Sequence, residues 1–198
     1  MRLGILLSGR GSNFEAIAQN VLAGKLHAEI GFVFSNRPNA PGLAIARRLG
    51  FACGSLEMGG LDRAAYDAKV AALLLDHEVE LVCLAGYMRL LSGGFVAQFP
   101  NRTLNIHPSL LPAFPGLDAQ YQALKHGVKV TGCTVHFVDD GLDSGPILLQ
   151  AAVPVQDDDT LETLSQRILV EEHRIYSDAI AWVSNGNFKI SDRRVIRT

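Results

Sequence analysis

Short apolar runs alternate with helical stripes through the first hundred residues. The runs at 3–7, 29–35 and 81–85 have the length and composition of strands. Between them, apolar residues recur every three or four positions, which predicts helices; the first stripe is Phe14, Ile17, Ala18, Val21 and Leu22. The run at 81–85 is apolar on both faces, as in a central parallel strand covered by helices. This alternation predicts a doubly wound α/β domain with right-handed crossovers.

The pattern changes after about residue 100. A strand at 103–107 precedes a proline-rich loop, and a helix is expected at 119–126. Two longer strands, 130–138 and 147–155, can pair as a hairpin antiparallel to at least part of the sheet. A last helix begins near Thr160. We therefore expect one domain over 1–198, with a mostly parallel sheet, an antiparallel C-terminal portion, and halves at 1–100 and 101–198.

Composition narrows the class of protein. Of 198 residues, 48% are hydrophobic and 19% charged, which is typical of a folded globule. A net charge of −2 leaves no basic surplus for nucleic acid or an anionic membrane. Cys53, Cys83 and Cys133 form no C-x-x-C pair, so we expect reduced core thiols. Neither a signal peptide nor an apolar stretch long enough to span a bilayer is evident, so we expect a cytoplasmic protein.

The glycine-rich loop SGRGSN at 8–13 lies between the first strand and the first helix. Backbone N–H groups and the positive end of the helix dipole converge at such a loop, which favours an anion. The alternative is a helix capped by a Ser12–Glu15 capping box, with nothing bound. A Walker motif is absent, and so are the third glycine and the acidic residue of a dinucleotide fingerprint. A phosphate monoester therefore fits better than a nucleotide.

Asn105 and His107 lie on one side of the strand at 103–107, which Pro108 ends. Ligands of open α/β sheets bind at the carboxyl ends of strands. An amide and an imidazole there could donate hydrogen bonds to a developing oxyanion, and the imidazole could also move protons. The alternative is a structural histidine at a strand end.

The loop at 139–146 holds three carboxylates. Asp139 and Asp140 can be simple turn formers. If Asp143 approached His107, its charge would favour the imidazolium form. Thr134 and His136 share a face of the preceding strand and are weaker candidates for the same cleft.

Two further choices stay open from periodicity alone. Met88 can be core filler or can face a ligand. Glu171 and Glu172 both flank the apolar stripe of the last helix, and helical spacing does not select one of them as the buried carboxylate.

Together these motifs resemble the phosphoribosylglycinamide formyltransferase family, within the wider formyltransferase superfamily. The resemblance covers essentially the whole chain. The segments that carry it are LLSGRGSN at 6–13, VFSNRPNAPGLAIA at 33–46, LAGYMRLLS at 84–92, LNIHPSLLPAFPG at 104–116, TGCTVHFVDDGLDSGPILLQ at 131–150 and EEHRIY at 171–176.

The resemblance implies a Rossmann-like fold and, in purine synthesis, formyl transfer from 10-formyltetrahydrofolate to the amine of 5-phosphoribosylglycinamide, without a metal. It makes 1–100 the phosphate-binding half and 101–198 the folate and catalytic half. The acceptor phosphate would lie on Gly11, Ser12 and Asn13. Glu172 would hold the ribose, while Leu169 could contribute only backbone or packing contacts. A homodimer is compatible with the sequence but not required by it.

The resemblance also assigns the folate site. Its pterin-binding walls would be Met88, Arg89, Leu90 and Leu91, together with Asp139, Asp140 and Gly141. Asn105 and Asp143 would border the same site. Arg63 and Arg89 would meet the anionic glutamate tail.

By the same resemblance, Asn105, His107 and Asp143 are the catalytic set. The amide and a protonated His107 would meet the tetrahedral oxyanion, while Asp143 keeps the imidazole cationic and orders a water for proton transfer. Some relatives carry a histidine in the stretch 118–121, which here is Asp-Ala-Gln-Tyr, so no essential role is expected there.

Three rivals remain. A deformylase of the same folate would share the catalytic set, although its relatives carry a regulatory domain and lack the GSN loop. An initiator-tRNA formyltransferase would need a further domain and more positive charge. A non-catalytic ligand-binding module belongs to a different class of function.

Overall fold

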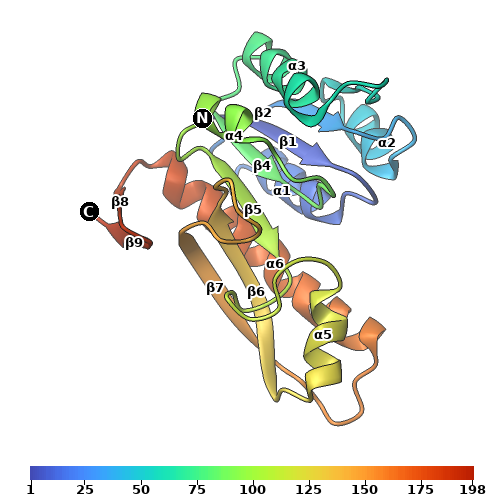
Figure 1. The fold of residues 1–198 in the computed structure, drawn as a ribbon, viewed down its shortest axis with the longest axis vertical. Coiled ribbons are helices and arrows are strands. Elements are labelled where there is room, and N and C mark those ends of the chain that lie inside the picture. The colour runs from blue at the N-terminus through green and yellow to red at the C-terminus, as the bar shows by residue number, and fades with distance from the viewer. The chain divides into compact units, whose positions relative to one another are not determined.

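A computed structural model describes all residues, 1–198, and divides them into two compact units, Met1–Leu104 and Asn105–Thr198. The boundary falls within strand β5 (Thr103–His107). Figure 1 shows the course of the chain, with the first unit in blue and green and the second in green to red. The predicted single domain with halves at 1–100 and 101–198 stays a prediction.

The first unit is a parallel sheet with helices between its strands, in the strand order β3-β2-β1-β4. Its elements are β1 (Arg2–Leu7), α1 (Ser12–Leu22), β2 (Glu29–Ser35), α2 (Pro41–Arg48), β3 (Cys53–Ser55), α3 (Arg63–Asp76), β4 (Leu81–Leu84) and α4 (Gly93–Gln98). The apolar residues of β1 and β4 are buried, as the continuous apolar runs predict. The doubly wound parallel arrangement is thus confirmed.

The order of these strands locates a binding edge. The chain moves outward from β1 to β2 and β3, then returns to the opposite side of β1 at β4. Right-handed crossovers therefore place α1 and α2 on one face and α3 on the other. In agreement, α1 packs against α2, and α3 against α4. The loops after β1 and β4 flank the point where the winding reverses, which is where open α/β sheets bind ligands.

The second unit is built on an antiparallel hairpin. Its elements after β5 are α5 (Ala119–His126), β6 (Val130–Phe137), β7 (Ile147–Pro154), α6 (Leu161–Ser184), β8 (Phe188–Ser191) and β9 (Arg194–Arg197). β6 and β7 pair antiparallel over their length, so the predicted hairpin is confirmed. β9 adds to β7 in parallel and pairs antiparallel with β8. The long helix α6 packs along β6 and β7 (Figure 1).

The predicted capping box at the start of α1 is wrong. Gly11, and not Ser12, is the N-cap, and it adopts a left-handed conformation with φ of 79°. Ser12 is the first helical residue, and its side chain caps nothing. The Glu15 carboxylate instead accepts a hydrogen bond from Arg48 at 2.8 Å. The S-x-x-E pattern places the N-cap one residue too late, at Ser12. The N-cap position needs a left-handed backbone, which glycine adopts readily, so Gly11 takes it.

Two remaining expectations concern membranes and thiols. No helix is both long and apolar enough to cross a membrane. All three cysteines are free; Cys83 and Cys133 are buried, whereas Cys53 is only partly buried. Burial raises the pKa of Cys133 to about 12, so this thiol is unreactive at neutral pH. The prediction of core cysteines is thus confirmed for two of the three.

Candidate active site

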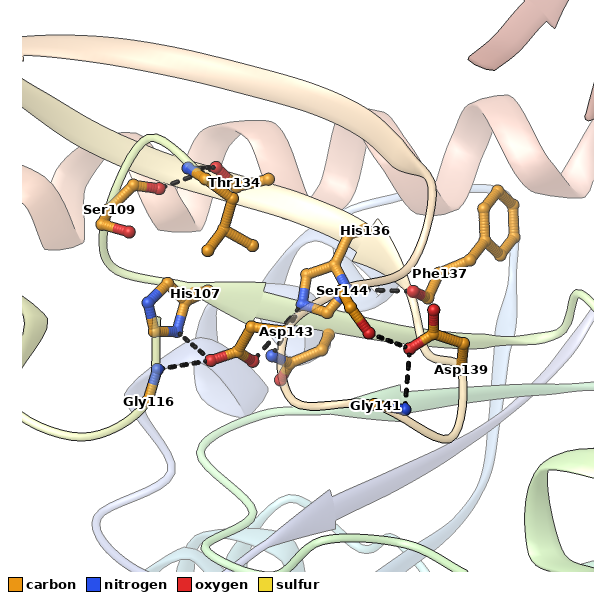
Figure 2. Close-up of polar contacts among 12 residues, drawn as sticks. His107, Ser109, Gly116, Thr134, His136, Phe137, Asp139, Gly141, Asp143 and Ser144 are labelled. Atoms are coloured by element: carbon orange, nitrogen blue, oxygen red, sulfur yellow. Dashed lines mark hydrogen bonds and ion pairs between the residues drawn. The ribbon is translucent and has the colours of Figure 1, made fainter. Parts of the chain in front are cut away.

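β5 carries the predicted pair Asn105 and His107 at its carboxyl end. His107 is buried, and its Nε2 donates to the backbone carbonyl of Phe114 at 2.8 Å. A carbonyl only accepts hydrogen bonds, so Nε2 bears the hydrogen. Nδ1 then faces the carboxylate of Asp143, 3.4 Å from Oδ2 (Figure 2). The structure therefore brings His107 and Asp143 into contact and leaves Nδ1 as the nitrogen that can gain or lose a proton.

The loop after β5 is folded to present the Phe114 carbonyl. Phe114 has a φ of 53°, a left-handed conformation that is costly for a bulky side chain. Ser109 Oγ donates to the carbonyl of Ala113 at 2.5 Å. Thr134 on β6 donates to the Ser109 carbonyl and accepts from the Leu111 amide. Thr134, a weak candidate for the cleft, thus holds this loop in place.

Asp143 is held by its own loop and by the loop after β5. Its φ is 49°, a left-handed conformation that aspartate tolerates better than most residues. Oδ2 accepts from the amide of Gly116 at 2.8 Å. Figure 2 shows how Asp139 shapes the same loop: its Oδ1 accepts from the Gly141 amide and from Ser144 Oγ. The turn-former interpretation of Asp139 is therefore confirmed, while Asp143 points at the imidazole.

His136 on β6 joins the cluster, although its sequence position made it only a weak candidate. Its Nδ1 lies 2.9 Å from the Phe137 carbonyl, and its Nε2 lies 3.1 Å from Asn105 Nδ2. Asp143 Oδ1 is 3.7 Å from the same Nε2. Burial lowers the pKa of His136 below its ordinary value of 6.5. His136 therefore contacts Asn105 and lies beside Asp143, so all three predicted catalytic side chains belong to one polar cluster.

The glycine-rich loop of the first unit is a tightly built turn. At Gly11 a Cβ would meet the Gly42 Cα at 2.9 Å, so the close approach of α2 admits only glycine there. The Gly42 amide in turn donates to the Gly9 carbonyl at 3.1 Å. The first amides of α1 follow at once, and such amides lack partners within a helix. Asn13, the second residue of α1, is buried.

Ser8 ties this loop to its neighbours. Its Oγ donates to Asn36 Oδ1 at 2.6 Å, just after β2, and accepts from the Met88 amide at 2.8 Å, after β4. Three loops at the carboxyl edge of the parallel sheet are thereby fixed relative to one another. The predicted phosphate-binding loop is therefore held by hydrogen bonds on both sides. One of them comes from Met88, the first residue of the segment 88–91 expected to bind folate.

The segment 88–91 divides by exposure. Met88 is 59% and Leu90 52% exposed, so the interpretation of Met88 as core filler is wrong. Leu91 is buried and packs inward. Arg89 lies over the ring of Tyr66 at 4.5 Å, which fixes the guanidinium against α3. Arg63 is the exposed first residue of that helix.

On α6, the structure separates the two glutamates that periodicity left open. Glu171 pairs with Arg174 at 2.6 Å on the surface. Glu172 is only 7% exposed and lies on the inner face of the helix. Leu169, one turn earlier on the same side, is partly buried. No group of three His, Cys, Asp or Glu side chains is arranged to hold a metal ion.

Sequence reasoning missed two backbone contributions to this site. The Phe114 carbonyl orients His107 and the Gly116 amide orients Asp143, but neither group depends on a side chain. The proline and glycine content of the segment 108–116 was the only available signal, and it indicates a fixed loop without saying which atoms the loop presents.

The chain is similar to known proteins over nearly its full length. The model of the formyl transferase family matches residues 1–180. The phosphoribosylglycinamide formyltransferase of Escherichia coli is 42% identical over 193 residues, which are 97% of this chain and 91% of that protein. The trifunctional purine biosynthetic protein adenosine-3 of Drosophila melanogaster is 46% identical over 195 residues, 96% of this chain. The chain spans only 14% of that larger protein.

Solved structures agree. Glycinamide ribonucleotide transformylase 1 from Symbiobacterium toebii superposes with a TM-score of 0.97 at 53% identity, covering 100% of this chain and 93% of that one. A formyltetrahydrofolate deformylase from Pseudomonas syringae has a TM-score of 0.92 at 24% identity, and this chain covers 65% of it, which shows a shared fold alone. With the matched family model and these relatives, the chain belongs to the formyl transferase family.

Proposed function

We propose that this protein is a phosphoribosylglycinamide formyltransferase, which transfers the formyl group of 10-formyltetrahydrofolate to the amine of 5-phosphoribosylglycinamide in purine synthesis. The observation that carries the proposal is the buried contact between His107 Nδ1 and Asp143 Oδ2 at 3.4 Å. Asn105 belongs to the same cluster through His136. Relatives of nearly the same length that bear this activity in their names support the choice of substrates.

The reaction sets three demands on the protein. The acceptor nitrogen bonds to the formyl carbon, the carbon–nitrogen bond to the folate breaks, and one proton passes from the acceptor amine to the folate nitrogen. Between these events, the formyl oxygen carries negative charge in a tetrahedral intermediate. The protein must therefore stabilise an oxyanion, move a proton and align two substrates.

Asn105 and His107 meet the first demand in different ways: the amide by donating a hydrogen bond, and the imidazolium by its positive charge, because its two N–H groups point at the Phe114 carbonyl and at Asp143. The Asn105 amide has a second N–H beyond the one directed at His136, and this N–H can donate to the oxyanion. His107 Nε2 stays hydrogen-bonded to the Phe114 carbonyl, so proton transfer would take place at Nδ1. Removing one oxyanion donor typically costs about 100- to 1,000-fold in rate.

Asp143 meets the second demand. In the neutral imidazole with hydrogen on Nε2, the Nδ1 lone pair would face a carboxylate, whereas a proton on Nδ1 gives a charge-assisted contact. The carboxylate therefore holds a proton on His107 and can order the water that carries a proton between the two substrate nitrogens. The Gly116 amide keeps the carboxylate aimed.

Two sets of residues are proposed to contact the acceptor, one for its phosphate and one for its ribose. The amides at Gly11, Ser12 and Asn13 would hold the phosphate, because a helix N-terminus favours an anion. Glu172 would accept hydrogen bonds from the ribose hydroxyls, and Leu169 would contribute packing.

For the folate, the exposed apolar side chains of Met88 and Leu90 offer surface to a flat pterin ring. In the 139–141 loop the Asp139 carboxylate is already used internally, so the loop would contribute mainly backbone groups. Arg63 and Arg89 would pair with the anionic glutamate tail. The proposal includes a cytoplasmic location and no nucleic-acid or membrane partner, and it is compatible with a homodimer.

An acceptor-dependence assay tests the proposal. The purified protein is incubated with 10-formyltetrahydrofolate, with and without glycinamide ribonucleotide, and both folate and formylated acceptor are measured. We expect formyl loss only with the acceptor and in equal amount to the product. Formyl loss that ignores the acceptor would instead indicate a hydrolase, and no loss at all would indicate a binding module.

A further inference from the structure

We propose that His136 is a positioning residue that holds the Asn105 amide in its reactive orientation by accepting one of its N–H groups at Nε2. Resting on the proposed function, this inference assigns a role to a residue outside the catalytic set. It is carried by two contacts of one imidazole, His136 Nδ1 to the Phe137 carbonyl at 2.9 Å and His136 Nε2 to Asn105 Nδ2 at 3.1 Å.

The contact with Phe137 fixes the tautomer. The carbonyl can only accept, so Nδ1 of His136 must carry the hydrogen. In the neutral ring Nε2 then has a lone pair and accepts. Burial favours this neutral form, since the side chain is only 2% exposed and its pKa lies below 6.5.

The tautomer in turn fixes the amide. A lone pair on Nε2 attracts the NH₂ end of Asn105 and repels its oxygen, so the amide cannot rotate by half a turn without losing this hydrogen bond. The second hydrogen on the same nitrogen thereby acquires a defined direction. An oxyanion hole works only when its donors are aimed before the charge develops. His136 supplies that aim without touching the reacting atoms.

The groups that face His136 explain why a neutral ring matters. Asp143 Oδ1 lies 3.7 Å from Nε2, and the charges of Asp143, Asp139 and His107 all act on the ring. A proton on Nε2 would turn the acceptor into a donor, break the contact with Asn105, and draw Asp143 away from His107. Loss of activity at low pH is therefore expected to include a contribution from His136.

Two neutral amides form a matched pair of variants. In His136→Gln the longer side chain can place an oxygen near the position of Nε2 and accept from Asn105. His136→Asn keeps a polar group near the Nδ1 position and the Phe137 carbonyl, but it does not reach Asn105. We expect His136→Asn to lower kcat about 10- to 100-fold with KM for both substrates little changed. We expect His136→Gln to retain kcat within about threefold of wild type. Because glutamine does not titrate, kcat of this variant should also fall less steeply than that of wild type at acidic pH.

A double-mutant cycle decides whether the effect passes through Asn105. Once Asn105→Ala has removed the amide, His136→Asn should lower kcat no further. Equal activity of the Gln and Asn variants, or a fall in kcat that multiplies with Asn105→Ala, would overturn the inference. An inactive wild-type protein would contradict the proposed function instead.

A spectroscopic readout tests the tautomer without any activity. The ¹⁵N chemical shifts of the His136 ring at pH 7.5 should show a protonated Nδ1 and an unprotonated Nε2 that accepts a hydrogen bond. The Nε2 shift should move in Asn105→Ala, where that donor is gone. A protonated Nε2, or an Nε2 shift unchanged by Asn105→Ala, would contradict the hydrogen bond from Asn105 to His136 Nε2.

Discussion

The His107 imidazole turns Nδ1, and not Nε2, toward the carboxylate of Asp143. Nε2 is already bound to the Phe114 carbonyl at 2.8 Å, and Nδ1 lies 3.4 Å from Asp143 Oδ2. Nε2 thus orients the ring, and Nδ1 faces a negative charge. The proton transfer proposed above is therefore assigned to Nδ1.

Asp143→Asn should lower kcat about 100-fold or more. The asparagine oxygen can still accept from the Gly116 amide, and asparagine tolerates the left-handed backbone, so the loop should keep its shape. What is lost is the negative charge that faces His107 Nδ1, and the expected fall has the size of a general acid–base contribution. Steady-state kinetics at saturating substrates measures the change.

Asp157→Asn is the control for that experiment. This carboxylate is exposed and pairs with Lys129 on the surface, so its loss should leave kcat unchanged. Wild-type turnover in Asp143→Asn would contradict the role given to the carboxylate.

Gly11→Ala should raise KM for glycinamide ribonucleotide about tenfold or more and leave KM for the folate nearly unchanged. The added methyl must enter a left-handed backbone and meet Gly42, which displaces the amides proposed to hold phosphate. Gly24→Ala is the matched control, since Gly24 has a similar φ of +69° and open space around it. A similar rise in KM in both variants would mean that general strain, and not the phosphate loop, is responsible.

As the pH is lowered through 6.5, the free energy of unfolding should decrease more steeply in wild type than in His136→Gln. Burial lowers the folded-state pKa of His136, so below 6.5 the unfolded chain takes up a proton that the folded protein refuses. Well above pH 6.5 the ring is neutral in both states and contributes no slope. One such proton gives at most about 1.4 kcal/mol per pH unit.

Urea unfolding between pH 8 and 5 measures this difference, because the other titrating groups are common to both proteins. The gap between the two curves should open only on the acidic side. Parallel curves across that range would show that His136 is not kept neutral by the fold.

Thiol-specific alkylation at neutral pH should label Cys53 and spare Cys83 and Cys133 in the folded protein. Cys53 is only partly buried, whereas burial raises the pKa of Cys133 to about 12 and shields both core thiols. Mass spectrometry counts the labels, and all three sites should react in urea. Rapid labelling of Cys133 without denaturant would contradict the packing of α6 on β6.

Strong, long-range patterns in the sequence located most of the fold. Strands β2 and β5 and helix α5 begin and end where the pattern predicts, because apolar periodicity and the flanking breakers agree. The three-residue strand β3 and the β8–β9 hairpin were missed. They carry too few residues for a period to emerge, and their pairing depends on neighbouring strands.

The sequence predicted which side chains form the candidate site, but not the hydrogen bonds that orient them. Alternation along β5 placed Asn105 and His107 together, and the loop motif indicated Asp143. The orientation of both rings depends on backbone carbonyls, which every residue possesses and no motif marks. His136 was underrated for that reason: its value lies in a tautomer that only the fold determines.

Turnover of Asn105→Ala and His107→Ala at saturating substrates tests the central claim most directly. If the amide and the imidazole stabilise one oxyanion, each substitution should lower kcat by at least about 100-fold while the protein stays folded. Turnover close to wild type in both variants would contradict the account.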